Sequence, residues 1–487
     1  MLAKVAVYIG VIGAFVAAIL GILRFGERLD TPRATEPSAA TAAASPVPAG
    51  GHSGPAGGDT GHLALLRENV THPLPLLLLQ VVVIVVAARL AGGVARRFGQ
   101  PAVIGEMIAG ILLGPSLLGW VWPSVQGFIF PASSLGSLRL LAQIGVVIFM
   151  FLVGIDLDGA HLRGMAHAAV WVSHLSITVP FLLGCALSLA IYRTLAPPGT
   201  QFTAFALFMG VAMSITAFPV LARILEEKGL TRTPLGATAI SCAAVDDVTA
   251  WCLLALVVTL VKAAALTGAL VTFALTLAFV AVMLLVVKPT ARRILGRREV
   301  AGDTLVVAGV AFLFLSALAT EVIGIHALFG AFLAGAVMPR HPAVRSYLRR
   351  RLETFGSVLL LPLFFAFTGL RTEIGLLGDL AGWLTCAAII GVAIAGKLGG
   401  TMIASRITGM SWPDSFALGA LMNTRGLIEL IVLNLGYDLG ILSPRVFSMM
   451  VLMALLTTFM TAPLLQLHAA IKRRRGEPVA TTADAAA

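Results

Sequence analysis

The chain has 487 residues, of which 58% are hydrophobic and only 12% are charged, and its mean hydropathy is +0.97. Because soluble domains contain about 25% charged residues, this composition excludes a soluble domain and indicates an integral membrane protein. The net charge of +11 does not indicate a nucleic-acid partner, since the basic residues fall between apolar runs, as the positive-inside rule expects. The spacing of the cysteines predicts no metal site, and no nucleotide-binding motif predicts a cofactor. No Ser/His/Asp pattern predicts a hydrolase, so we expect a protein that is not an enzyme.

Two short segments precede the main membrane domain. Residues 1–24 form an apolar run long enough for one helix, which is either an extra membrane anchor or a signal-like sequence. Residues 25–62 are rich in Ala, Pro, Gly and Ser, which predicts a flexible linker that cannot bury a core. At the other end, residues 471–487 are expected to form a basic, disordered tail. We expect no attached nucleotide-binding domain, because no GxGxxG motif occurs.

The region 63–470 contains thirteen further apolar runs, each of which predicts a membrane-spanning helix. The runs cover residues 73–93, 102–119, 137–155, 167–192, 202–226, 235–261, 265–288, 303–320, 322–338, 355–370, 378–404, 413–436 and 446–469. Six runs precede the linker helix at 265–288 and six follow it, so the two halves have opposite orientations in the membrane. Such inverted repeats are typical of secondary transporters.

The basic residues of the loops predict the orientation. One side contains Arg96, Lys228, the segment from Lys288 to Arg298 and the segment from Arg340 to Arg351, whereas the opposite loops offer single Lys or Arg residues. The positive-inside rule places the richer side, with the C-terminus, in the cytoplasm, and we expect a bacterial inner (plasma) membrane. The basic residues 345–351 are expected to lie in a solvated loop that can touch anionic lipid.

Two adjacent carboxylates, Asp246 and Asp247, lie near the middle of the apolar run 235–261. An acidic residue at the centre of a membrane helix costs ~2.5–3.5 kcal/mol on insertion scales, so a functional site is the first interpretation. The alternative is that both carboxylates pair with buried bases and only hold helices together. Lys397 lies well inside another run and needs a counter-ion. Since adjacent helical residues point about 100° apart, one Asp can pair with Lys397 while the other faces an ion path.

Two of the predicted helices are interrupted by polar, proline-containing or glycine-containing sequence. Pro219 removes a backbone donor and clashes with the preceding turn, so the run 202–226 should kink or open near Ser214 and Thr216. A second break is expected in the run 413–436. One interrupted helix in each half is the best sequence indication of a transporter site. The residues expected to support the breaks are Pro219, Asn423, Arg425, Gly426 and Glu429, with Arg425 and Glu429 paired at i and i+4.

A carboxylate that holds either a proton or a hard monovalent cation is sufficient for antiport, because both ligands compete for the same oxygen atoms. Burial and a neighbouring like charge favour the protonated form of a carboxylate and bring its titration towards physiological pH. Hydroxyl and carbonyl groups of the break at 214–219 can complete the shell of Na+ or K+. The alternative function is a cation channel or uniporter of the same fold without proton coupling.

At this point the residues match a known family. The matching segments are Gly105–Gly119, Phe149–Asp156, Ser214–Arg223, Ala243–Trp251 and Asn423–Glu429. On these segments the chain resembles the monovalent cation:proton antiporter superfamily. It resembles the second branch, which includes Kef-type transporters, sodium/proton antiporters and plant cation/H+ exchangers. The resemblance covers about residues 63–470.

The resemblance implies a 13-helix inverted-repeat antiporter fold with two crossed broken helices, to which this chain adds one N-terminal hydrophobic helix. It also implies a homodimer in which a core moves against a scaffold. The core would be helices 167–261 and 378–469, and the scaffold would be helices 73–155 and 303–370. In the family, the second acid of the pair carries the ion and the proton, which falls on Asp247. The first acid, Asp246, pairs with the core lysine, here Lys397, and Thr216 falls beside the site.

Overall fold

The computed structural model describes seven ranges of the chain, and all of the regular secondary structure in them is helical. These ranges are residues 2–29, 72–156, 167–231, 233–262, 266–295, 302–339 and 341–475. Most of the expected linker at 25–62 and of the expected tail at 471–487 lies outside them. Within them, ten helices are long and apolar enough to cross a membrane, or eleven if a bent pair forms one span. The chain is an all-helical, multi-pass membrane protein.

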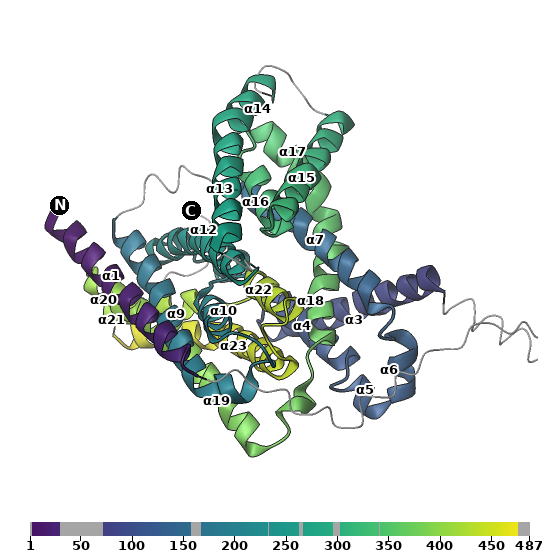
Figure 1. The fold of residues 1–487 in the computed structure, drawn as a ribbon, viewed down its shortest axis with the longest axis horizontal. Helices are drawn as coiled ribbons and strands as arrows, with labels where there is room; N and C mark the ends of the chain where they lie inside the picture. The colour runs from purple at the N-terminus through teal and green to yellow at the C-terminus, as the bar shows by residue number, and fades with distance from the viewer. Residues whose placement is uncertain are drawn as a thin grey trace, which may run out of the picture.

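One set of helices, which we call the first group, packs mainly on itself and occupies one side of the molecule (Figure 1). Its members are α3 (Pro73–Arg97), α4 (Ala102–Leu113), α7 (Leu135–Asp156), α15 (Asp303–Ile323), α16 (Ala327–Ala336), α17 (Pro342–Phe355) and α18 (Leu361–Leu370). Short helices connect α4 to α7, and a π-helical turn joins α17 to α18. These connectors are α5 (Leu118–Val121), α6 (Pro123–Ile129) and η2 (Gly356–Leu360).

The remaining helices of the membrane domain form the second group. Its members are α9 (His167–Leu195), α10 (Phe202–Ser214), α11 (Phe218–Glu227), α12 (Pro234–Lys262), α19 (Leu380–Ile394), α20 (Gly400–Ile407), α21 (Trp412–Met422), α22 (Leu427–Asp438) and α23 (Pro444–Arg474). The turn η3 (Ile374–Leu377) leads into α19, and the π-helical turn η4 (Ala395–Gly399) joins α19 to α20. The two groups are linked by α13 (Leu266–Val282), η1 (Met283–Val287) and α14 (Lys288–Leu295). Helix α13 contacts both α12 and α15.

Small residues allow the helices of the first group to approach closely. A Cβ atom on Gly110 of α4 would lie 2.1 Å from the carbonyl oxygen of Ala366 in α18. A Cβ atom on Gly369 of α18 would lie 2.5 Å from the carbonyl oxygen of Met107 in α4. Such close backbone approach is a common way of packing helices in a membrane, where apolar lipid removes the hydrophobic force between them. A larger side chain at either glycine would force these two helices apart.

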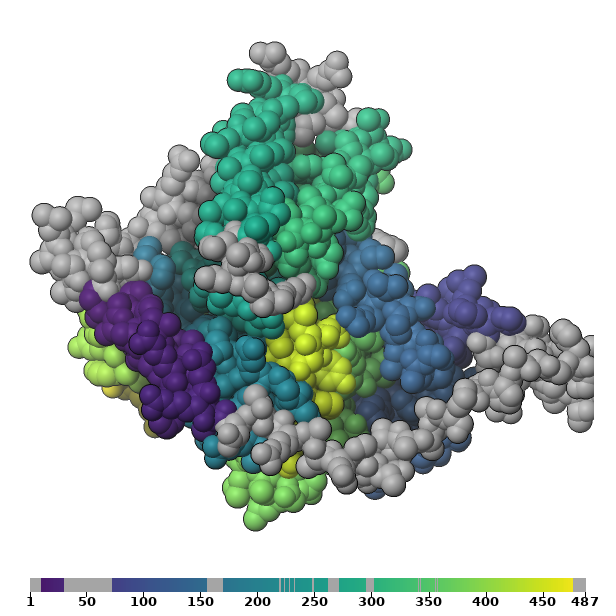
Figure 2. All heavy atoms as spheres, viewed as in Figure 1, coloured from purple at the N-terminus to yellow at the C-terminus, as the bar shows by residue number. Residues whose placement is uncertain are grey.

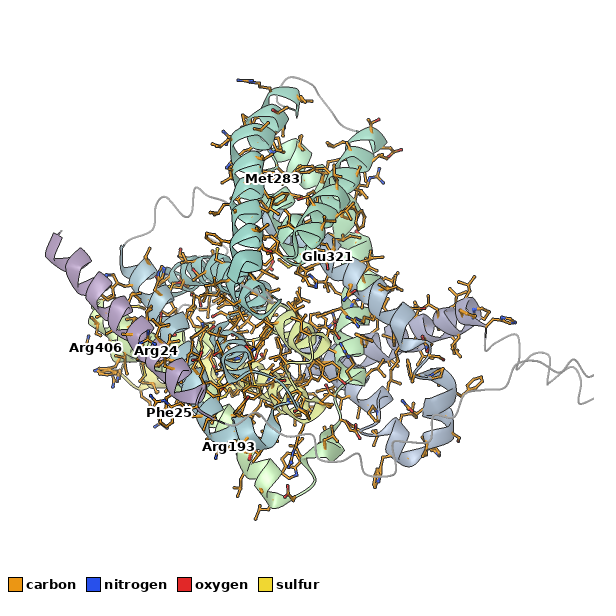
Figure 3. All side chains as sticks on the ribbon, in the orientation of Figure 1. Arg24, Phe25, Arg193, Met283, Glu321 and Arg406 are labelled. Carbon is orange, nitrogen blue, oxygen red and sulfur yellow. The ribbon has the colours of Figure 1, made fainter. Side chains whose placement is uncertain are left out.

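The N-terminal helix α1 (Leu2–Gly26) lies on the outside of the second group, against α9 and α10 (Figure 2). Figure 3 labels Arg24 and Phe25 of its last turn at this edge of the bundle. Just beyond the helix, Thr203 Oγ1 donates a hydrogen bond to Glu27 Oε1 at 3.2 Å. The described part of the apolar run, from Leu2 onward, is therefore a helix packed against the membrane domain.

The helices match the predicted runs in position but not always in length. All thirteen runs fall on helices of the described ranges. However, the run 202–226 is divided between α10 and α11, and the run 322–338 contains the ten-residue helix α16. Neither is long enough to count as a single span, so the described residues contain ten or eleven helices that could cross a membrane, where thirteen runs were expected. The division of 202–226 follows from its internal proline.

The prediction of a solvated loop at residues 345–351 is wrong, because α17 covers them. Val344 and Leu348, one helical turn apart, are buried, whereas Arg349 and Arg350 are exposed. This spacing gives the segment one apolar stripe that can pack on the first group. An amphipathic helix therefore replaces the expected loop.

Candidate functional site

Two interrupted helices of the second group meet near its centre (Figure 1). Helix α10 ends at Ser214 and α11 begins at Phe218, with Pro219 in its first turn, where a proline fits a helix start. Helices α21 and α22 are bent by 45° at their break. The two breaks are joined directly, because the backbone N–H of Ala217 donates a hydrogen bond to the carbonyl of Thr424 at 2.9 Å.

A glycine permits this contact between the breaks. A Cβ atom on Gly426, at the start of α22, would lie 2.8 Å from Val220 Cγ2 and 3.2 Å from Ala217 Cβ. Any larger residue would push α22 away from α11. Gly426 therefore supports the meeting of the two breaks through close packing.

Two buried cations cap the C-terminal end of α10. The guanidinium of Arg425 donates to the carbonyls of Ala212 at 2.8 Å and Met213 at 2.7 Å. The ammonium of Lys397 donates to the carbonyl of Ser214 at 2.7 Å. The last carbonyls of a helix lack intrahelical partners and carry partial negative charge, so cations stabilise this end. The carbonyl groups that the break leaves without intrahelical partners are therefore hydrogen-bonded, although they are buried.

Lys397 lies on the π-helical turn η4 and is completely buried. Its ammonium donates to Asp246 Oδ2 at 2.8 Å and to the carbonyl of Ser176 at 3.0 Å, besides Ser214. An ammonium has three donors, and here each of them has an acceptor. The sequence-predicted pair of Asp246 and Lys397 is thus brought together as a buried ion pair.

Asp246 is surrounded by donors on both of its oxygens. Ser173 Oγ donates to Oδ1 at 2.5 Å, and Ser176 Oγ donates to Oδ2 at 3.1 Å. Thr216 Oγ1 lies 2.9 Å from Asp246 Oδ2 and 3.0 Å from the carbonyl of Met422. Together with Lys397, these groups fill the coordination of this carboxylate and leave it few positions for a further ligand.

Asp247 differs sharply from its neighbour. It is only 3% exposed, and its Oδ1 has no hydrogen-bond partner among the described residues. Phe218, at the start of α11, lies beside this carboxylate. A buried carboxylate oxygen without a donor is costly unless a proton or a cation binds there. We call it the open oxygen.

The other predicted residues surround these carboxylates. The hydroxyl of Ser214 donates to Val211 of its own helix, and only the carbonyl of Ser214 contacts Lys397. Asn423 is buried at the end of α21, and neither its amide oxygen nor its amide nitrogen has a partner in the described residues. Arg425 lies 3.3 Å from Glu429 as an ion pair, although neither Glu429 oxygen forms a hydrogen bond there.

Three hydroxyl residues of this site were not among the predicted ones. Ser173 and Ser176 of α9 hold Asp246, and Thr458 of α23 both donates to the carbonyl of Arg425 and accepts from its backbone N–H. The spacing of Ser173 and Ser176, three residues apart on one helix face, could have indicated a polar stripe. Thr458 carries no such signal, because isolated threonines are common in membrane helices.

A comparison with family models decides the classification of the chain. The model "Sodium/hydrogen exchanger, transmembrane" matches residues 82–467, which is most of the sequence. The chain belongs to this sodium/hydrogen exchanger family. Members of this exchanger family are membrane transporters that carry out cation/H+ antiport, and they are not enzymes.

Individual relatives support membership of the exchanger family. The chain is 44% identical over 398 residues to "Na(+)/H(+) antiporter NhaS4" of Synechocystis sp., covering 81% of this chain and 97% of that protein. It is 41% identical over 397 residues to "Cation/H(+) antiporter 17" of Arabidopsis thaliana, covering 81% and 48%. It is 34% identical over 410 residues to "K(+)/H(+) antiporter 1" of Saccharomyces cerevisiae, covering 82% and 47%. The exchanger domain thus spans about half the length of the plant and yeast relatives.

The fold also resembles a solved exchanger structure. The sodium proton antiporter MjNhaP1 from Methanocaldococcus jannaschii superposes with a TM-score of 0.57, covering 82% of this chain and 96% of that one. Because only 13% of the residues are identical, this likeness concerns the fold alone.

Proposed function

We propose that the protein is a secondary active antiporter that exchanges Na+ or K+ for protons, with Asp247 as the shared carboxylate. One observation carries the proposal: Asp247 is buried with an open oxygen, directly beside Asp246, whose two oxygens are already bonded. One carboxylate group can hold a proton or a cation but not both, so binding of one displaces the other. The relatives, whose names include a sodium/proton and a potassium/proton antiporter, support the same class of reaction.

The charges of the site explain why exchange would be coupled. Lys397 and Asp246 neutralise each other, as do Arg425 and Glu429. Asp247 then adds one negative charge, which a proton or a monovalent cation cancels. Moving an uncompensated charge through a low-dielectric barrier is expensive. The loaded site therefore moves easily and the empty site does not, so each proton that crosses is exchanged for a cation.

The first break is proposed to complete the ion- and proton-binding region. Besides Asp247 and Asp246, we assign Thr216 and Ser214 to this region. The hydroxyl of Thr216 lies within hydrogen-bond distance of Asp246, and the carbonyl of Ser214 accepts from Lys397. In this proposal Lys397 and Asp246 tune the affinity of Asp247.

The supporting residues are proposed to hold the two breaks open. Pro219 starts α11, Gly426 allows α22 to approach it, and Arg425 caps α10 with Glu429 as its counter-ion. We also assign Asn423 to this support. Its unpartnered amide oxygen is a second open acceptor beside Met422, whose carbonyl lies 3.0 Å from Thr216 Oγ1.

The proposed movement follows the two groups of helices. The second group, with helices 167–261 and 378–469, would be the moving core, and the first group, with helices 73–155 and 303–370, the scaffold of a homodimer. The helix at 265–288 would link two inverted halves of a thirteen-helix fold whose broken helices cross. We place the protein in the bacterial inner membrane with its C-terminus in the cytoplasm, as the distribution of basic loops favours.

The proposal is tested with purified protein in liposomes that contain a pH-sensitive dye and an imposed proton gradient. Na+, K+ or Li+ is added separately to the wild type, to Asp247→Asn and to Asp303→Asn, an exposed control on α15. We expect at least one cation to dissipate the gradient with the wild type and the control but not with Asp247→Asn. Tracer cation flux that moves no protons would instead support a channel or uniporter and contradict the proposal.

A further inference from the structure

A pocket of about 560 Å³ lies at one end of the second group, and Asp247 does not line it. Four segments form its walls: the end of α11, the first turns of α12, the turn that leads into α21 and the last turns of α23. It is therefore a separate feature from the pair of breaks. Its chemistry is decided by its charged and apolar lining residues.

Positive charge exceeds negative charge in this pocket. Its lining includes Lys228, His468, Lys472 and Arg473, but only one carboxylate, Asp414. Asp414 Oδ1 is bound by Lys472 at 2.8 Å and by His468 at 3.2 Å. Among the described residues, Lys228 and Arg473 form no ion pair. Lys228, which follows α11, and Arg473 of α23 therefore line the pocket without an ion pair to any residue that the structure describes.

The start of α12 adds further attraction for an anion. Thr233 Oγ1 accepts a hydrogen bond from the backbone N–H of Gly236 at 3.1 Å and so caps this helix. The first turn of α12 lines the pocket, and the N-terminus of a helix carries partial positive charge. The remaining walls are largely apolar and are made by Leu230, Leu235, Met410 and Leu465.

We propose that this pocket binds the phosphate group of an anionic phospholipid. Lys228 and Arg473 would hold the phosphate, and the apolar walls would contact the glycerol and the first methylene groups of the chains. A free phosphate ion shares the charge but makes no use of these walls, so the lipid is the better fit. The ligand would join the end of α11, the helix that follows the first break, to α23, beside the start of α12, the helix that carries Asp247. This inference concerns binding and does not depend on the proposed exchange reaction.

Native mass spectrometry of the purified full-length protein tests the proposal. Dioleoylphosphatidylglycerol is the probe, dioleoylglycerol tests the chains without phosphate, and inorganic phosphate tests the ion without chains. The variants are Lys228→Gln, Arg473→Gln and the charge-preserving Lys228→Arg. Arg350→Gln is the matched control, since Arg350 is an exposed basic residue on α17, outside the pocket. Size-exclusion chromatography verifies that each variant is folded.

We expect Lys228→Gln and Arg473→Gln each to weaken retention of dioleoylphosphatidylglycerol about fivefold, because each basic residue near a lipid surface contributes about that factor. Lys228→Arg and Arg350→Gln should retain the lipid like the wild type. Equal retention by all variants would overturn the proposal. So would equal binding of dioleoylglycerol, which would exclude a role for the phosphate. Displacement of the lipid by inorganic phosphate would identify a site for the free ion instead.

Discussion

The two groups of helices bury different kinds of residue. The first group is held by close backbone contacts, such as that between Gly110 and Ala366. Among the described residues, every buried charged side chain lies in the second group, namely Asp246, Asp247, Lys397, Arg425 and Glu429. Buried charges are expensive in a membrane and are kept where they have a use. The difference teaches that the first group is packed closely, whereas the second keeps the buried charges that we propose to bind an ion.

The largest effect is expected at Asp247, where a substitution should abolish transport without lowering the thermal stability of the protein. Asp247→Asn should reduce cation-driven proton movement to the rate of empty liposomes, because the neutral amide cannot take up a proton or compensate a cation. Thermal unfolding in detergent should stay close to that of the wild type, since the open oxygen has no hydrogen bond to lose. If Asp247→Asn is inactive and also unfolds at a much lower temperature than the wild type, Asp247 contributes to stability, and the contrast between the two groups fails.

The second effect concerns the ion pair of Lys397 and Asp246, which lies beside Asp247. Lys397→Met leaves the buried Asp246 with hydroxyl donors but without a cation, and should destabilise the protein by about 3–5 kcal/mol. Adding Asp246→Asn should recover much of that loss, because no uncompensated charge remains. Thermal unfolding of the wild type, both single variants and the double variant measures the coupling. Additive losses in the double variant would show that the two groups do not act as a pair.

The third effect lies in the first group. Gly110→Ala places a Cβ atom 2.1 Å from the Ala366 carbonyl oxygen, so α4 and α18 must separate. We expect a loss of about 1–3 kcal/mol in stability, the usual range for overpacking. Gly127→Ala in α6 is the control, because a Cβ atom there meets nothing within 4 Å. A melting temperature unchanged by Gly110→Ala would show that the first group tolerates wider spacing and is not rigid.

A polar cluster between the groups gives the fourth effect. Asp438, at the end of α22, is held by Arg371 at 2.5 Å and by Arg139 of α7 at 2.8 Å, and Arg371 lies over the ring of Tyr437 at 4.3 Å. Because these side chains are partly exposed, Asp438→Asn should lower stability by only about 1–2 kcal/mol. The apparent cation affinity should not change. A shift in affinity measured by tracer uptake would place this interface within the binding machinery.

The smallest effect depends on pH. The backbone N–H of Gly382, at 2.9 Å, and then the nearby Arg445 hold the pKa of Asp379 below its usual value. Because the folded pKa is depressed, the stabilisation is present above the unfolded value of about 3.9 and is lost as pH falls through the folded pKa. Asp379→Asn keeps an acceptor for the backbone N–H of Gly382 at the start of α19, but it removes the dependence of stability on pH. Its melting temperature should lie slightly below that of the wild type at pH 7 and approach it as the pH falls through the folded pKa of Asp379.

The sequence alone identified the helical membrane class and the family, because long apolar runs and several motifs are local signals. It also drew attention to Asp246, Asp247 and Lys397, since isolated charges in apolar runs are conspicuous. It could not show that Ser173 and Ser176 hold Asp246, because which side chains face each other across helices depends on packing. The amphipathic helix α17 was missed because its apolar stripe is short and the segment contains many arginines.

The central claim is that one carboxylate, Asp247, takes a cation and a proton in turn. Equilibrium binding of radioactive Na+ or K+ (as Rb+) to purified protein across pH 5 to pH 9 tests it most directly. If the two ligands compete for that carboxylate, the apparent Kd of the cation should rise about tenfold for each unit of falling pH on the acidic side. Asp247→Asn should bind no cation at any pH. A cation Kd that stays constant across this range in the wild type would contradict the shared site.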